Sequence, residues 1–264
     1  MYISSRENPG IKKLVKLLSS RKARSEYGEF AIEGARNCLD AANESVSGNI
    51  ELTAFYCTQQ AMEKYAAADL VGRLDGSIVF EISPQLAERI PGSENGQGMF
   101  AVAKKLDKAF SADTIDPSGK YIVLDGLQDP GNVGTIIRTC DAVGASGIVM
   151  TGNCCDIYNP KVVRSAMGSM SRVDMYIEND FYKVADMFRE AGIANIASVI
   201  ENGRDIRQTD FHRPCALYIG NEGSGMPKEH IGYCDESATI CMQGRINSLN
   251  AAVAAAIMLW EMFR

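Results

Sequence analysis

Residues 124–145 read LDGLQDPGNVGTIIRTCDAVGA, and they combine an apolar run, a polar loop and an amphipathic segment. The apolar run YIVLDGL at residues 121–127 predicts a strand, and residues 135–143 follow with apolar positions at helical spacing. Between them lies a polar, glycine-bearing loop that contains Asn132, while Arg138 projects from the side of the helix opposite its apolar face. The order resembles a nucleotide-binding turn, yet no G-x-G-x-x-G occurs. The stretch predicts an α/β unit whose loop carries polar side chains.

The same alternation of strands and helices continues to the end of the chain. Further strands are predicted at residues 147–152, 195–200, 215–220 and 237–242, and helices at residues 160–169, 181–191, 227–231 and 248–263. Apolar strands separated by helices predict a parallel sheet that is covered on both faces. The first hundred residues predict a smaller α/β unit. We therefore expect one domain over residues 1–105, a linker over 106–118 and a second domain over 119–264.

Composition excludes several classes of protein. Hydrophobic residues make up 46% and charged residues 23% of the chain, which is ordinary for a globular protein, and the N-terminal residues lack an apolar signal core. The longest apolar run, residues 251–260, is shorter than the roughly 20 residues of a membrane span. The eight cysteines form no C-x-x-C pair, so we expect buried, reduced thiols, no metal site and a cytoplasmic location.

Charge is unevenly distributed along the chain. The formal net charge of −6 argues against a polyanionic partner, but the first 36 residues hold eight cations against four acids. A solvated helix face explains such a run equally well. The cations are Arg6, Lys12, Lys13, Lys16, Arg21, Lys22, Arg24 and Arg36.

Three polar loops follow strands of the predicted second domain. They are DPGNVG, NEGSGMP and QGRINSLN, at residues 129–134, 221–227 and 243–250. In open α/β sheets, ligands bind outside the carboxyl ends of the strands. Glycines in the second loop let the backbone approach a ligand, and Glu222 is an acceptor beside them. Asn247 or Ser248 is the natural N-cap of the closing helix. The three loops together predict a binding site.

Three long segments resemble a known family, in the same order and spacing. The segments DPGNVGTIIRTCDAVGASGIVM, IGNEGSGMPKE and ATICMQGRINSLNAAVAAAI are similar to the three motifs of the SpoU (TrmH-like) RNA ribose 2′-O-methyltransferases of the SPOUT superfamily. The N-terminal segment NPGIKKLVKLLSSRKARSEYGEFAIEGARNCLDA resembles the L30e-like substrate-binding domain of the rRNA-directed branch. This resemblance implies a SPOUT domain with a parallel sheet and a deep trefoil knot, preceded by a smaller L30e-like α/β domain.

The resemblance also implies a cofactor and a set of site residues. S-adenosyl-L-methionine is expected in the knot of a homodimer formed through the C-terminal domain. The implied cofactor-binding residues are Ser198, Gly220, Asn221, Gly223, Ile240, Met242 and Leu249. The implied catalytic residues are Arg138, Asn132, Glu222, Ser248 and Asn250. Candidate RNA-binding cations are Lys12, Lys13, Arg21, Lys22, Arg24, Arg36, Lys161 and Arg164.

The implied reaction is methyl transfer to a ribose 2′-hydroxyl of RNA, and 23S rRNA is the favoured substrate. Free guanidinium has a pKa above about 12 and is a poor base. Two roles for Arg138 remain open: acting on the 2′-hydroxyl in a perturbed site, or binding phosphate and orienting the ribose. Alternative functions are a tRNA 2′-O-methyltransferase, a non-catalytic RNA-binding protein with this fold, and an NAD enzyme. The missing glycine triplet disfavours the last of these.

Overall fold

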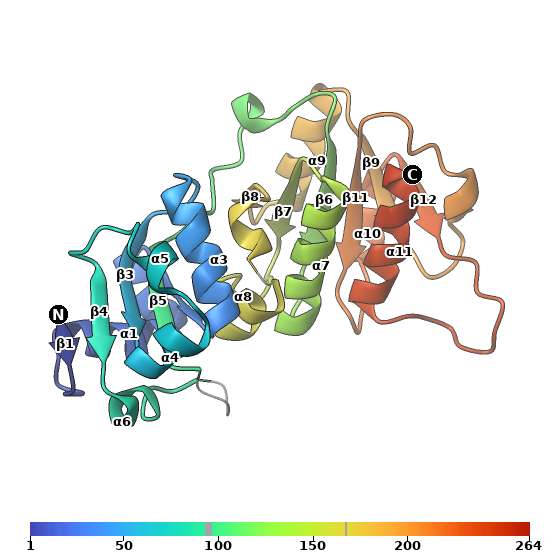
Figure 1. The fold of residues 1–264 in the computed structure, drawn as a ribbon. Helices are drawn as coiled ribbons and strands as arrows, with labels where there is room; N and C mark the ends of the chain where they lie inside the picture. Colours follow the sequence, from blue (N-terminus) through green and yellow to red (C-terminus); the bar gives the residue numbers. More distant parts are fainter. Residues whose placement is uncertain (93–96, 167) are drawn as a thin grey trace. The chain divides into compact units, whose positions relative to one another are not determined.

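The computed structural model describes residues 1–92, 97–166 and 168–264. Its chain divides into two compact units (Figure 1). The first unit comprises Met1–Leu106 together with Asp156–Arg172. The second comprises Asp107–Cys155 and Val173–Arg264.

The first unit is built around a five-stranded mixed sheet in the order β1-β4-β3-β5-β2. Its strands are β1 (Tyr2–Ile3), β2 (Glu29–Glu33), β3 (Leu52–Cys57), β4 (Val79–Ile82) and β5 (Met99–Lys104). Its helices are α1 (Pro9–Ser19), α2 (Arg21–Tyr27), α3 (Ala35–Val46), α4 (Gln59–Lys64), α5 (Ala68–Val71), α6 (Pro84–Ala87) and α8 (Pro160–Ala166), with a 3₁₀ turn at Ser169–Ser171. The β5 strand runs antiparallel to both β2 and β3, and the remaining pairs are parallel.

The segment Asp156–Arg172 belongs to the first unit although it follows a strand of the second in sequence. Its helix α8 contacts β2, and the ring of Tyr158 packs against Phe30 with centroids 4.8 Å apart. Arg164 on α8 lies 3.3 Å from the buried carboxylate of Glu33 at the end of β2. The first compact unit therefore includes Asp156–Arg172, a segment that lies within the predicted second domain at residues 119–264. The predicted boundaries of the two domains along the sequence, at residues 105 and 119, stay a prediction.

The second unit contains a seven-stranded sheet in the order β10-β12-β9-β11-β6-β7-β8. Every pair in it is parallel, as the sequence predicts. The strands are β6 (Lys120–Asp125), β7 (Gly147–Thr151), β8 (Met175–Ile177), β9 (Ala194–Ser198), β10 (Arg204–Asp205), β11 (Cys215–Gly220) and β12 (Glu236–Thr239). The helices are α7 (Pro130–Val143), α9 (Phe181–Glu190), α10 (Lys228–Tyr233) and α11 (Ala251–Phe263), with 3₁₀ turns at Ala112–Thr114 and Ile206–Gln208.

Helices cover both faces of this sheet (Figure 1). On one face, α9 buries Phe181, Val184 and Phe188 against alternate strand residues. On the other, α7 and α11 pack against each other, α7 against β7 and α11 against β11. Because strands covered on both faces have no solvated side, they read as nearly continuous apolar runs.

Several local predictions need correction. Helix α7 begins at Pro130, five residues before the predicted start, because Asp129 caps it by accepting from the backbone N–H of Asn132 and proline suits the first turn. Asn132 therefore lies in the helix and not in a loop. The cap of α11 is Asn250, whose side chain accepts from the N–H groups of Ala252 and Val253.

Two further features of the structure concern the predicted linker and the predicted thiols. The predicted linker contributes Phe110 and Ile115 to the core of the second unit. Cys241 is exposed, although all eight thiols are predicted to be buried. Over the described part of the chain, no helix has the length and apolar character that a membrane crossing requires.

Candidate functional site

A cavity of about 230 Å³ lies at the carboxyl ends of β9, β11 and β12. Its walls come from the loop at residues 221–227, which we name the glycine loop, and from residues 239–251 with the start of α11. All seven predicted cofactor-binding residues line it: Ser198, Gly220, Asn221, Gly223, Ile240, Met242 and Leu249. Glu222 and Ser248 line it as well. The structure thus brings two of the three predicted loops around one cavity.

The glycine loop is shaped by its own side chains and by tight packing. Asn221 Oδ1 accepts from the backbone N–H groups of Gly223 at 2.9 Å and Ser224 at 3.2 Å. A Cβ at Gly220 would lie 2.4 Å from the backbone nitrogen of Met226, so only glycine fits where the loop leaves β11. Gly225 has a φ of +67°, which other residues rarely adopt. The loop is therefore preformed around the cavity.

Glu222 links the glycine loop to the start of α7. Its carboxylate accepts from the backbone N–H of Gln128 at 3.1 Å and of Asp129 at 2.8 Å. Asn132 Nδ2 donates to the same carboxylate at 3.1 Å. Burial alone would raise the pKa of Glu222, but these three hydrogen bonds stabilise the charged form and lower its pKa below the usual value. The side chain is therefore a carboxylate at neutral pH.

Asn132 joins the third predicted loop to the other two. Asn250 Nδ2 donates to Asn132 Oδ1 at 3.0 Å, while Asn132 itself is only 8% exposed. Asn250, Asn132 and Glu222 therefore form a chain of hydrogen bonds that runs through all three loops. Each amide uses both its donor and its acceptor. An apolar or acidic replacement at Asn132 would break this chain at its centre.

Arg138 lies elsewhere on α7, where it is exposed. It is six residues beyond Asn132, or about 9 Å along the helix axis. Three residues before it, on the same side of the helix, Thr135 lines a shallow hollow with Val253, Ile257 and Trp260 of α11. Arg138 is not among the described residues that line the 230 Å³ cavity.

The predicted RNA-binding cations differ in their exposure. Arg21, Lys22, Arg36, Lys12 and Lys161 are exposed. Lys13 pairs with the buried Glu29, and Arg164 with Glu33.

Arg24 is a correction to this set. It is only 4% exposed, pairs with Asp156 at 2.8 Å and donates to the carbonyl of Leu17 at 2.6 Å. A buried, paired arginine cannot reach a phosphate, so its role is structural.

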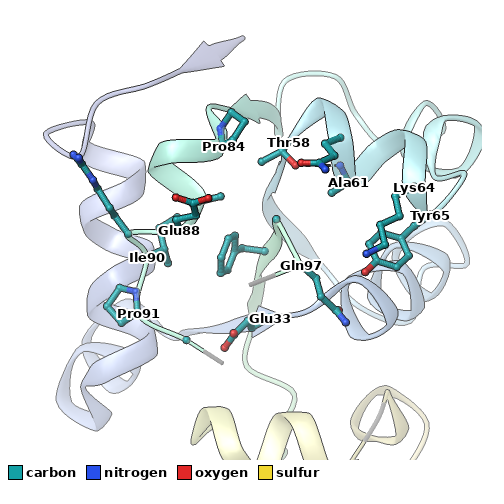
Figure 2. Close-up of a pocket in the computed structure, with 16 residues that line it drawn as sticks. Glu33, Thr58, Ala61, Lys64, Tyr65, Pro84, Glu88, Ile90, Pro91 and Gln97 are labelled. Carbon is teal, nitrogen blue, oxygen red and sulfur yellow. Dashed lines mark hydrogen bonds between the residues drawn. The ribbon is translucent and has the colours of Figure 1, made fainter. Parts of the chain in front are cut away.

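A larger cavity, of about 900 Å³, lies in the first unit (Figure 2). Lys64 and Tyr65 stand on one side of it and Glu88 and Ile90 on the other. The Lys64 ammonium lies 5.3 Å from the centroid of the Tyr65 ring. The buried Phe100 also lines the cavity. The sequence gives no signal for this cavity, because its walls come from four separate segments.

Sequence reasoning also missed residues that support the site. The backbone of Gln128 holds Glu222, and Gly126 accepts from Asn221 Nδ2 at 2.9 Å. Asp125 is buried at the end of β6, with one carboxylate oxygen 2.6 Å from His230 Nδ1. The position of Asp125, an acidic residue at the end of an otherwise apolar strand, is the feature of the sequence that could have indicated its supporting role.

Comparison with protein families gives two matches along the chain. Residues 119–260 match the model of the SpoU rRNA Methylase family. Residues 8–101 match the MRM3-like substrate binding domain.

Individual proteins resemble nearly the whole chain. A 23S rRNA (uridine(2479)-2′-O)-methyltransferase of Streptomyces viridochromogenes is 32% identical over 94% of this chain and 87% of its own. The crystal structure of an AdoMet-bound rRNA methyltransferase from Sinorhizobium meliloti is 30% identical, with a TM-score of 0.84 over 99% of this chain and 97% of that one. The SpoU methyltransferase AviRb from Streptomyces viridochromogenes, in complex with AdoMet, is 28% identical, with a TM-score of 0.84 over 97% of each chain.

Proposed function

Because the chain belongs to the SpoU rRNA methylase family, we propose that it transfers a methyl group from S-adenosyl-L-methionine to a ribose 2′-hydroxyl of RNA, with 23S rRNA as its substrate. The observation that carries this proposal is the chain of hydrogen bonds from Asn250 through Asn132 to Glu222, which lies beside a preformed cavity. An rRNA-modifying enzyme works where ribosomes assemble, so we place the protein in the cytoplasm.

The cavity fits the cofactor by its chemistry. Apolar side chains of Ile219, Ile240 and Leu249 suit an adenine ring, and the glycine loop exposes backbone groups that suit its polar edge. When bound, S-adenosyl-L-methionine supplies a methyl group that is already activated on a sulfonium. The enzyme therefore has to align the 2′-hydroxyl with that methyl group and to accept one proton. We also propose that residues 240–250 thread through a trefoil knot to reach the cavity.

We assign Arg138 to the RNA backbone. Its guanidinium binds a phosphate bidentately and orients the adjacent ribose, because so poor a base is unsuited to proton removal. Glu222 keeps its carboxylate engaged with three donors, so its role is to fix Asn132 and the start of α7. Asn250 holds the third loop beside Asn132, and Ser248 lines the cavity next to it.

The active enzyme is proposed to be a homodimer through α7 and α11. Val253, Ile257 and Trp260 are 48%, 39% and 70% exposed on one face of α11. A run of large apolar side chains on a helix surface is typical of a protein interface. Arg138 lies on the same side of α7 as the hollow that these residues form with Thr135. Dimerisation would bring Arg138 to the interface.

Trp260→Asp is expected to convert the dimer to a monomer and to abolish methyl transfer. A carboxylate at the centre of an apolar interface remains unpaired, which costs about 2–5 kcal/mol of association free energy. Light scattering after gel filtration measures the mass, and Ile177→Asp, at an exposed apolar position of β8, is the matched control. A dimer that persists in Trp260→Asp contradicts this interface.

The first unit is proposed to bind the rRNA substrate. Its 900 Å³ cavity offers Tyr65 for stacking, Gln60 and Glu88 for hydrogen bonds, and Lys64 and Arg89 as cations. Sequence-specific recognition of RNA usually targets unstacked bases in loops and bulges, which aromatic and polar side chains hold. Exposed cations such as Arg21, Lys22 and Arg36 add salt-dependent affinity for the backbone.

Lys64→Ala is expected to weaken RNA binding and to lower the slope of log affinity against log salt by about 0.7 to 0.9. Removing one phosphate contact releases one counterion fewer. Filter binding over a series of salt concentrations measures the slope. Lys183→Ala in the second unit, where Lys183 pairs with Glu178, is the control. An unchanged slope in Lys64→Ala would remove this cavity from the RNA interface.

Methyl transfer in vitro tests the proposed function. The protein is incubated with radiolabelled S-adenosyl-L-methionine and with rRNA or tRNA, and the digested nucleosides are separated. We expect a 2′-O-methylated nucleoside from rRNA. Label in tRNA alone would favour the tRNA alternative, and label in neither RNA would favour a non-catalytic RNA-binding protein. Calorimetry with S-adenosylhomocysteine and NAD separates the family function from that of an NAD enzyme.

A further inference from the structure

Helix α10 follows the glycine loop directly, yet none of its six residues is buried. A helix this short is not stable alone, so tertiary contacts must hold it in place. Ile231 and Tyr233 are partly buried against the core of the second unit, and the other contacts of α10 come from polar and aromatic side chains. The position of the loop before it therefore depends on those side chains.

His230 makes the contacts at the centre of α10. Its Nδ1 lies 2.6 Å from Asp125 Oδ2, and the Asp125 side chain is 5% exposed. Because a carboxylate only accepts, Nδ1 is the donor. The other oxygen, Asp125 Oδ1, accepts from the buried Thr151 hydroxyl at 3.0 Å. The imidazole also stacks on Phe181, with centroids 3.9 Å apart and planes at 4°.

Asp125 and Gly126 are consecutive residues at the end of β6, and together they hold both ends of the glycine loop. Asn221 at the start of the loop donates to the carbonyl of Gly126 at 2.9 Å. His230, three residues after the loop, is held by Asp125. Between these two anchors the loop forms one wall of the 230 Å³ cavity. Loss of either anchor would free one end of that wall.

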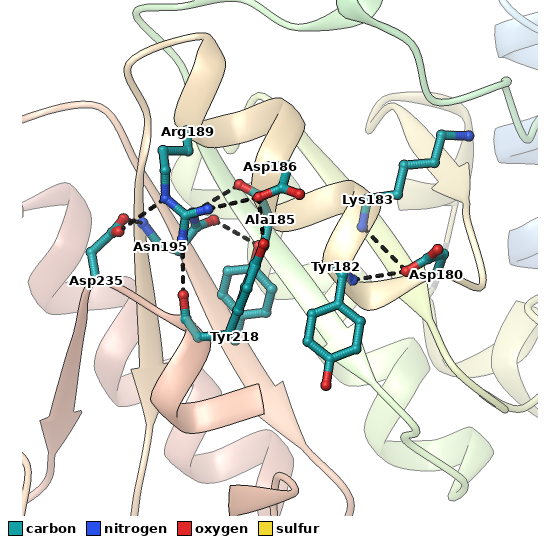
Figure 3. A network of polar contacts seen from close by, with 10 residues as sticks. Asp180, Tyr182, Lys183, Ala185, Asp186, Arg189, Asn195, Tyr218 and Asp235 are labelled. Atoms are coloured by element: carbon teal, nitrogen blue, oxygen red, sulfur yellow. Dashed lines mark hydrogen bonds and ion pairs between the residues drawn. The ribbon is translucent and has the colours of Figure 1, made fainter. Parts of the chain in front are cut away.

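The far end of α10 is held by a separate network around Arg189 (Figure 3). Arg189 donates to the carbonyl of Tyr233 at 2.9 Å and pairs with Asp186 and Asp235. The Tyr233 hydroxyl donates to Asp186 at 2.8 Å. This network contacts the C-terminal end of α10, whereas the glycine loop precedes its N-terminal end. None of the network residues is among the described residues that line the cavity. It therefore offers a control on the same helix.

We propose that His230 is a positioning residue for cofactor binding, whose hydrogen bond to Asp125 fixes the C-terminal end of the glycine loop. This inference rests on the proposed function, because it takes the 230 Å³ cavity as the cofactor site. His230 is not among the described residues that line the 230 Å³ cavity. His230 acts through the glycine loop, which α10 anchors. Its replacement should therefore change the affinity for the cofactor more than the rate of methyl transfer in the cofactor-bound enzyme.

Three variants separate the hydrogen bond from the stacking and from helix stability. His230→Phe keeps a ring on Phe181 but leaves Asp125 Oδ2 without the imidazole donor. His230→Asn keeps an N–H close to the position of Nδ1. Tyr233→Phe removes the hydroxyl contact at the other end of α10. Calorimetry with S-adenosylhomocysteine gives the Kd, methyl transfer to rRNA gives kcat and KM for S-adenosyl-L-methionine, and thermal melting gives Tm.

We expect His230→Phe to raise the Kd by about tenfold, and His230→Asn and Tyr233→Phe by no more than about threefold, with kcat at saturating cofactor changed little in all three. A Kd for His230→Phe equal to that of the wild type overturns the proposal. A loss of affinity in all three variants that merely parallels their loss of Tm overturns it as well. If His230→Phe does not fold, Asp125→Asn replaces it in the comparison of Kd values. This variant weakens the acceptor of the same hydrogen bond, because an amide oxygen carries no charge. Failure of the wild-type protein to bind S-adenosylhomocysteine would instead overturn the proposed function.

Discussion

Arg138→Ala is expected to lower the rate of methyl transfer by at least about 100-fold, because a ribose displaced by even about 1 Å from its reactive position loses a factor of this size. The exposed guanidinium lies away from the cavity lining, so the Kd for S-adenosylhomocysteine should stay within about twofold of the wild-type value. Steady-state kinetics with rRNA and calorimetry with the cofactor product measure the two effects separately.

Arg138→Lys is the matched control for this prediction. Lysine keeps the charge but not the planar fork that binds a phosphate with two parallel hydrogen bonds. We expect an intermediate rate and a raised KM for RNA. Turnover retained in Arg138→Ala would contradict the assigned role. A full rate in Arg138→Lys would show that charge alone suffices.

Asn132→Asp is expected to lower methyl transfer at pH 8 by about 30- to 150-fold and to recover part of it at pH 6. In the wild-type protein, Asn132 Nδ2 lies 3.1 Å from Glu222 Oε1. In Asn132→Asp a carboxylate oxygen would take the place of this nitrogen and face Glu222. Two carboxylates at this distance cannot both ionise freely, so one pKa of the pair rises. The shared proton is bound below that raised pKa and is lost as the pH rises through it. Because Glu222 is exposed, water screens the repulsion between the two carboxylates and reduces the shift in pKa.

The control for this pH dependence is Asn132→Ala. It removes the same hydrogen bonds to Glu222 and Asn250 without adding a titratable group. Its activity relative to wild type should therefore be the same at pH 6 and pH 8. An activity ratio for Asn132→Asp that does not change with pH, or that falls as the pH is lowered, would contradict the carboxylate pair.

The fold of the second unit could be predicted from the sequence because its signals are local. Each strand is a short apolar run, each helix has its own periodicity, and parallel pairing follows from their alternation. The order of the strands has no such local signal. The small strands β1 and β10 pair only two residues each and depend on distant partners. The membership of Asp156–Arg172 in the first unit likewise depends on contacts with Phe30 and Glu33, which are more than a hundred residues away.

The sequence predicts which loops carry the candidate site, but it does not predict the hydrogen bonds that connect them. The three loops are predicted from their composition, and nine of the predicted site residues line one cavity. The start of α7 was missed because the DPGN segment reads as a turn, although Asp129 and Pro130 also form a strong helix start. The backbone hydrogen bonds that hold Glu222, and the burial of Arg24 against Asp156, arise only when distant segments meet.

Mapping ribose methylation along 23S rRNA in cells tests the central claim most directly. RNA from cells that lack the gene is compared with RNA from cells that carry the wild-type gene or the Arg138→Ala gene. We expect one 2′-O-methylated nucleotide to disappear without the gene, to return with the wild type and to stay absent with Arg138→Ala. An unchanged map, or a lost modification that lies on a base and not on a ribose, would contradict the proposed reaction.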